Sequence, residues 1–122
     1  GEGERSNVIV VGDLNTMGMD ATYHAPDITA DEELERYEAI LGHADMQYLS
    51  KTAGATWYDV DGEHEPSDLD HAFASEHLAF ETFGDGAELD VRGWPEASEP
   101  SARAEWCRRY SDHAMLDGEV VG

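Results

Sequence analysis

The chain is poor in lysine and cysteine, and it has no long apolar run. Lys51 is its only lysine and Cys107 its only cysteine among 122 residues. A single cysteine excludes an internal disulfide and is typical of a reducing compartment, so we expect a cytoplasmic protein. No apolar stretch reaches the length of about 18 residues that spans a bilayer, and residues 1–4 do not have the pattern of a signal peptide. We therefore expect a soluble chain that does not bind membranes.

Basic residues of both kinds are scarce. Lys and Arg together number 7 against 28 Asp and Glu, which gives a formal net charge of −21. This charge repels a polyanion in dilute salt, whereas in molar salt a Debye length of about 3 Å screens it. Because the acidic residues are dispersed and no long acidic run concentrates the field, adaptation to high salt explains the charge better than a specific cationic partner does.

Hydrophobic patterning predicts a single α/β (α+β) domain over residues 1–122. We expect a buried strand at residues 8–11, an irregular segment at 17–28, and a helix that Thr29 caps and Gly42 ends. A second helix is expected from Pro100 to about Arg109. Strand-like runs lie between and after the helices, at residues 56–58, 69–75, 78–83, 87–91 and 112–121. The pattern favours one mostly antiparallel sheet that helices cover on one face.

Two short polar motifs near opposite ends of the chain carry the functional signal. The sequence GDLN at residues 12–15 directly follows an apolar run, so Asp13 and Asn15 are expected where a strand ends. The sequence SDH at residues 111–113 opens the last strand-like run. Either motif alone also suits a turn or a strand-start cap. Their pairing favours phosphate-ester chemistry at a divalent metal.

The residue types of these motifs match the needs of phosphoryl transfer, which requires a metal, a carboxylate that handles water, and donors to the phosphate. Asp13 can orient water or bind the metal, and Asn15 can donate an amide hydrogen bond to the phosphate. Asp112 offers a further carboxylate, and His113 offers a proton or a positive charge. Asp70 is the natural candidate for fixing the tautomer of His113.

With the strand-like run LDHAFAS at residues 69–75 between them, the motifs resemble those of the endonuclease/exonuclease/phosphatase superfamily. This superfamily includes deoxyribonuclease-like enzymes and apurinic/apyrimidinic endonucleases. The resemblance implies that Asp13 orients or deprotonates water, that Asn15 holds the scissile phosphate and that Asp112 assists metal binding. It further implies that His113 stabilises the transition state, with Asp70 hydrogen-bonded behind it.

The chain departs from the superfamily pattern in two places. Ala114 and Met115 follow the SDH motif, where a proline usually stands two residues after the histidine. Members of the superfamily resemble a four-layer α/β sandwich, and this chain resembles only its carboxyl-terminal half. The amino-terminal half would supply an Asn and a Glu to the metal. Since a lone half exposes an apolar sheet face, we expect a homodimer or association with the missing half.

These observations predict a metal-dependent phosphodiester hydrolase that uses Mg²⁺ or Mn²⁺, with nucleic acid as the expected substrate. Two alternatives stay open. The chain is a catalytically incomplete, non-enzymatic module, or it is a phosphomonoesterase or lipid phosphodiesterase of the same superfamily. Fold alone does not separate them.

Other polar and aromatic patterns favour structural roles. The histidines outside the SDH motif lack zinc-site spacing, and the tryptophans lack the basic neighbours of a base-stacking surface. The acidic run after Asp59 favours a hairpin turn over a calcium loop, because Gly62 stands at position four and not six. Cys107 is expected to be a packed helix residue and not a nucleophile.

Overall fold

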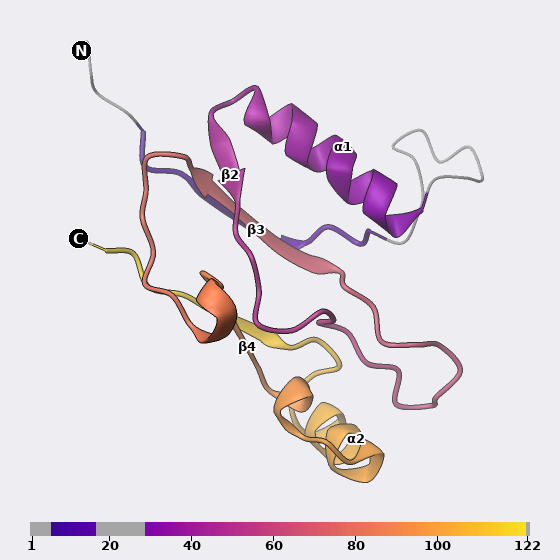
Figure 1. The fold of residues 1–122 in the computed structure, drawn as a ribbon. Helices are drawn as coiled ribbons and strands as arrows, with labels where there is room; N and C mark the ends of the chain where they lie inside the picture. Colours follow the sequence, from indigo (N-terminus) through magenta and orange to yellow (C-terminus); the bar gives the residue numbers. More distant parts are fainter. Residues whose placement is uncertain (1–5, 17–28, 122) are drawn as a thin grey trace.

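The computed structural model describes residues 6–16 and 29–121, and it has a mixed α+β architecture (Figure 1). The irregular segment expected at residues 17–28 lies outside the described residues. The elements are, in chain order, β1 (Ile9–Asp13), α1 (Ala30–Gly42), β2 (Met46–Tyr48), β3 (Asp70–Ser75), β4 (Asp90–Arg92), α2 (Pro100–Arg109) and β5 (Met115–Asp117). Two short 3₁₀ turns, η1 (Gly84–Gly86) and η2 (Trp94–Glu96), flank β4.

The strands form two antiparallel sheets within the described residues, so the expectation of one sheet is wrong. The larger sheet has the order β1-β3-β2, and the smaller one pairs β4 with β5. The runs at residues 56–58 and 78–83 form isolated bridges, such as Phe80 with Val120, and not strands. Each run is followed closely by a turn with acidic residues and glycine, at residues 59–62 and 84–86. β2 was not expected, because its three residues give too short a pattern.

The two helices follow the sequence prediction closely, but they do not share one sheet face. The Thr29 hydroxyl accepts a hydrogen bond from the Glu32 backbone N–H (3.1 Å), as the capping pattern predicted. α1 contacts β2 and lies along the larger sheet, whereas α2 packs on η2, away from that sheet (Figure 1). Of the two described helices, α1 alone therefore covers the larger sheet. Neither described helix combines the length and apolar character that a membrane crossing requires.

α2 packs closely against the backbone of Gly93. This glycine has φ of 111°, and a Cβ there would lie 2.6 Å from the Trp106 ring. Any other residue would need both a strained backbone and a displaced indole. Gly93 therefore allows α2 to pack directly against the segment that carries the buried Trp94.

The core lies between the two sheets and leaves β1 outside it. All residues of β3 are buried, and the central cluster comprises Leu49, Ala72, Ala74 and Leu89. By contrast, Ile9, Val10 and Val11 of β1 are 49%, 40% and 61% exposed. The prediction of a buried strand here is wrong, because a β-branched run indicates a strand but not whether another layer covers it.

Candidate functional site

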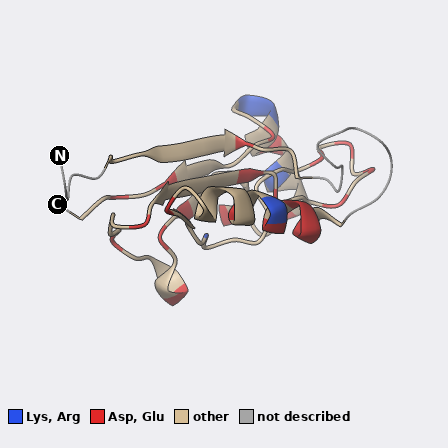
Figure 2. Ribbon diagram, turned by 90° about the horizontal axis from the view of Figure 1, so that it is seen from above, with Lys and Arg blue, Asp and Glu red and all other residues tan. Residues whose placement is uncertain are grey.

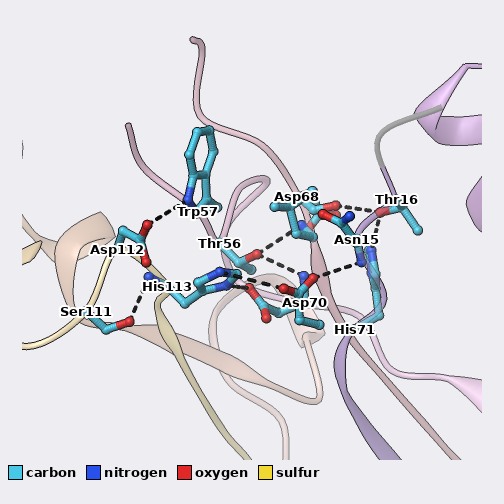
Figure 3. A network of polar contacts seen from close by, with 12 residues as sticks. Asn15, Thr16, Thr56, Trp57, Asp68, Asp70, His71, Ser111, Asp112 and His113 are labelled. Atoms are coloured by element: carbon cyan, nitrogen blue, oxygen red, sulfur yellow. Dashed lines mark hydrogen bonds and ion pairs between the residues drawn. The ribbon is translucent and has the colours of Figure 1, made fainter. Parts of the chain in front are cut away.

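Three segments that are distant in sequence meet at one end of the larger sheet (Figure 3). Asp13 ends β1 and Asp70 begins β3, and the antiparallel register pairs these two residues. The third segment contains His113, which pairs with Trp57 in an isolated antiparallel bridge. The Tyr58 N–H donates to the Asp112 carbonyl (3.0 Å), which fixes the segment beside the sheet.

The His113 imidazole lies between the carboxylates of Asp70 and Asp13. Its Nδ1 is 2.8 Å from Asp70 Oδ2, and its Nε2 is 3.7 Å from Asp13 Oδ2. The Asp70 carboxylate accepts from Nδ1–H, so Nε2 faces Asp13. Partial burial alone lowers the pKa of His113, but the hydrogen bond and charge of Asp70, together with the charges of Asp13 and Asp112, raise it above 6.5 overall. The charged form of this ring is therefore favoured more than that of a free imidazole.

Asp70 is held by a buried threonine that the sequence did not single out. The Thr56 side chain is fully buried, and its Oγ1 accepts hydrogen bonds from the backbone N–H groups of Leu69 (3.1 Å) and Asp70 (3.0 Å). The Thr56 carbonyl in turn accepts from the Trp94 indole (3.1 Å). This arrangement fixes the backbone from which the Asp70 carboxylate projects.

Asn15 occupies a tight turn directly after Asp13. The Asn15 N–H donates to Asp13 Oδ1 (2.8 Å), and the Asn15 backbone has φ of 52°, a left-handed conformation that asparagine tolerates better than most residues. Both side chains are solvent-exposed at the end of β1. The turn therefore presents a carboxylate and an amide together to a ligand from solution.

Asp112 lies next to the site, but its carboxylate is engaged elsewhere. Asp112 Oδ2 accepts a hydrogen bond from the Trp57 indole N–H (3.0 Å), while the His113 N–H donates to Ser111 Oγ (3.0 Å). Figure 3 shows Asp112 turned toward Trp57 and His113 turned toward Asp70. Asp112 therefore contributes charge near His113 without joining its carboxylate partners.

Asp13, Asp70 and His113 are placed where they could hold a metal ion. One ligand atom from each residue lies within 4.8 Å of those of the other two. Carboxylate oxygens suit hard divalent cations, and an imidazole nitrogen is compatible with Mn²⁺ and other transition metals. Of the two residues expected to bind metal, the structure places Asp13 in this cluster and directs Asp112 to Trp57.

A second polar cluster lies behind Asp70 and was not foreseen from the sequence. Its centre is the buried His71, which contacts Lys51, Tyr48 and Thr16. Burial, followed by the charge of Lys51, lowers the pKa of His71, and burial lowers the pKa of Lys51 against the opposing effect of Asp68. The signal available in the sequence was the uniqueness of Lys51 in so acidic a chain.

No protein-family model, curated protein or solved structure matches this chain. The function is therefore inferred from the site geometry and from the motifs that the site brings together.

Proposed function

We propose that the protein is a metal-dependent phosphodiester hydrolase of the endonuclease/exonuclease/phosphatase type. The observation that carries this proposal is the position of His113, whose imidazole is 2.8 Å from Asp70 and 3.7 Å from Asp13. A histidine oriented by one buried carboxylate, with its second nitrogen facing an exposed one, has the arrangement of a general acid or a charge stabiliser. Asn15 adds an amide beside the same exposed carboxylate.

Each of these residues has a role in the proposed hydrolysis. The Asp13 carboxylate orients the attacking water and accepts its proton, and the Asn15 amide donates a hydrogen bond to a phosphate oxygen. The His113 imidazolium stabilises the charge that develops on the phosphorus oxygens. Asp70 keeps Nδ1 protonated and directs Nε2 toward the position of the phosphate.

The proposal includes Mg²⁺ or Mn²⁺, which the carboxylates of Asp13 and Asp70 would hold, because the His113 imidazolium has no lone pair to offer a metal. A bound divalent ion neutralises phosphate charge and lowers the pKa of the attacking water. Because Asp70 also accepts a hydrogen bond from His113, its second carboxylate oxygen is the one left for a cation. Two protein carboxylates leave room for water and for substrate oxygens.

Nucleic acid is the proposed substrate, and α2 offers the basic groups closest in sequence to the SDH motif. Arg108 and Arg109 are exposed in the last turn of α2, directly before Tyr110 and Ser111. Figure 2 shows blue basic residues on this helix in a ribbon otherwise marked by many red acidic ones. In molar salt the remaining acidic surface is screened, so contact between these arginines and a phosphodiester backbone is not prevented by the net charge.

The exposure of β1 favours a second candidate, a module that becomes active only on association. Ile9, Val10 and Val11 are half exposed, although apolar β-branched residues on a strand normally face another layer. We propose that the described residues correspond to the carboxyl-terminal half of a four-layer α/β sandwich. In this proposal a second copy, or a segment equivalent to the amino-terminal half, covers β1 and completes the metal site.

The test is hydrolysis of DNA and of bis-p-nitrophenyl phosphate in molar salt with Mg²⁺ or Mn²⁺. We expect activity in the unchanged chain and a loss of on the order of 100-fold or more in Asp13→Ala and His113→Ala. Activity that persists in both variants would overturn the mechanism. A folded but inactive chain would favour the module that requires association.

A further inference from the structure

Lys51 is the only lysine of the chain, and its side chain is 4% exposed. A buried ammonium group lowers the stability of the fold unless it is paired and hydrogen-bonded, whereas a lysine at the surface has no such cost. Lys51 follows β2 and reaches the start of β3. The buried ammonium group therefore lies next to the end of the sheet that carries the proposed catalytic residues.

All three polar partners of Lys51 among the described residues lie in one short segment. Its Nζ forms an ion pair with Asp68, donates to the Asp70 carbonyl oxygen (2.8 Å) and contacts His71 Nδ1 (3.2 Å). Asp70 is thus contacted from behind through its backbone, while its carboxylate faces His113. The ammonium group therefore holds the Asp70 backbone directly and contacts Asp68 and His71 through their side chains.

The contact with His71 continues to the other strand of the site. Nδ1 lies 3.2 Å from Lys51 Nζ and also 2.9 Å from the Tyr48 hydroxyl. Because an ammonium group only donates, Nδ1 is the acceptor and the proton of the neutral ring resides on Nε2. Nε2–H then donates to Thr16 Oγ1 (2.8 Å), and the Thr16 hydroxyl donates to the Asp68 carbonyl (2.8 Å). Thr16 is 3% exposed and directly follows Asn15.

The direction of these hydrogen bonds excludes a second catalytic pair. A histidine that activates a threonine hydroxyl must offer a free lone pair to that hydroxyl. Here Nε2 carries the proton, so His71 cannot act as a base toward Thr16. The contact therefore links two structural segments and does not create a nucleophile.

We propose that Lys51 is a positioning residue that sets the spacing between the Asp13–Asn15 turn and Asp70. The effect of Lys51 on catalysis rests on the proposed function, whereas its effect on the positions of the site residues can be measured without any activity. Lys51 holds the start of β3 directly and holds the turn after β1 through His71 and Thr16. Misplacement of a catalytic group by about 1 Å can cost on the order of 100-fold in rate, so this spacing bears directly on catalysis.

The experiment compares Lys51→Met, Lys51→Arg and Thr16→Val with Ser75→Ala in the full chain in molar salt. Ser75 is the matched control, because it is a buried polar residue that links β3 to Val8 at the opposite end of the same strand pair. The measurements are the unfolding midpoint, kcat and KM for bis-p-nitrophenyl phosphate, Mn²⁺ affinity, and the NMR shift of the Asn15 side-chain amide.

We expect Lys51→Met to lower kcat on the order of 10-fold to 100-fold with KM changed less than about threefold, and to shift the Asn15 amide signal. Lys51→Arg is expected to have a kcat between those of Lys51→Met and the unchanged chain. Thr16→Val is expected to shift the Asn15 signal while the Lys51–Asp68 ion pair stays intact. Ser75→Ala is expected to lower the unfolding midpoint without either effect.

The proposal is overturned if Lys51→Met and Thr16→Val change kcat, Mn²⁺ affinity and the Asn15 signal no more than Ser75→Ala does. If the unchanged chain shows no hydrolysis, the proposed function fails, and the Asn15 signal and Mn²⁺ affinity still decide the positioning role. If Lys51→Met does not fold, Thr16→Val decides it, since that substitution preserves side-chain volume and leaves Lys51 in place.

Discussion

Asp13 and Asp70 face each other as the last register pair between β1 and β3, and His113 contacts both carboxylates from a third segment. Two carboxylates at the end of one strand pair repel each other unless a cation lies between them. In the described site His113 supplies that charge when protonated, and a divalent metal would supply more. The pH dependence of the protein should therefore report on this trio of residues.

The first prediction concerns the stability of the metal-free protein. The pKa of His113 is raised above 6.5 in the folded state, so its protonation stabilises the fold. This contribution is fully present below the unfolded-state pKa and is lost as the pH rises through the raised folded-state pKa. His71 and Lys51, whose pKa values are lowered, titrate with the opposite sign. We therefore expect the contribution of His113 to the urea midpoint in chelator, measured against a variant that cannot titrate, to fall as the pH rises from about 6 to 9.

The control for this prediction is His113→Gln, which cannot titrate. The difference in midpoint between the unchanged chain and this variant should shrink toward high pH. A difference that stays constant, or that grows with pH, would contradict a raised pKa. Asp70→Asn should also weaken the dependence, because it removes the hydrogen-bonded carboxylate that contributes most to raising the pKa.

The second prediction concerns Thr56, whose buried hydroxyl accepts from two backbone N–H groups. Thr56→Val keeps the volume but leaves the Leu69 and Asp70 amides without this acceptor. We expect a loss of about 2 kcal/mol in the free energy of unfolding, together with a fall in kcat, because Asp70 loses its support. Thr29→Ala removes only the helix cap of α1 and should cost about 1 kcal/mol with kcat unchanged. Equal effects of both substitutions on kcat would contradict the role given to Thr56.

Much of the fold and of the site was predictable because local chemistry determines it. The cap at Thr29, the proline at the start of α2 and the strand containing Asp70 are local signals, and the structure confirms them. The burial of β1 was not predictable, since it depends on which layer covers the strand. The roles of Thr56 and Lys51 depend on contacts across 14 and 20 residues of sequence separation, which no local pattern encodes.

The third prediction concerns the hydrogen bond between Trp57 and Asp112. The indole N–H donates a hydrogen bond to Asp112 Oδ2, so this carboxylate is directed to Trp57 and not to the cluster of Asp13, Asp70 and His113. Trp57→Phe removes the donor and keeps an aromatic ring. If Asp112 assists metal binding, this variant should bind Mn²⁺ more tightly by a few-fold, measured by calorimetry. Asp112→Asn should bind it more weakly, and combining the two substitutions should abolish the gain. Unchanged affinity in both single variants would exclude Asp112 from metal binding.

The last prediction concerns the open edge of β1. The Val8 carbonyl accepts from the Ser75 N–H, and the Leu14 N–H donates to the Leu69 carbonyl (both 2.9 Å). Antiparallel alternation therefore points the backbone groups of Ile9 and Val11 away from β3. In the described sheet β1 is an edge strand without the charged side chains or prolines that block pairing along residues 9–11.

We therefore expect the chain to self-associate through β1 in molar salt and to dissociate as the salt is lowered, because the net charge of −21 then becomes unscreened. Val11→Glu should yield a monomer in sedimentation experiments at every salt concentration. Ile40→Glu is the matched control, since Ile40 is 66% exposed on α1, close to the 61% of Val11, and it should leave association unchanged. A monomeric unchanged chain in molar salt would contradict the homodimer, and the covering layer would then have to come from a different polypeptide segment.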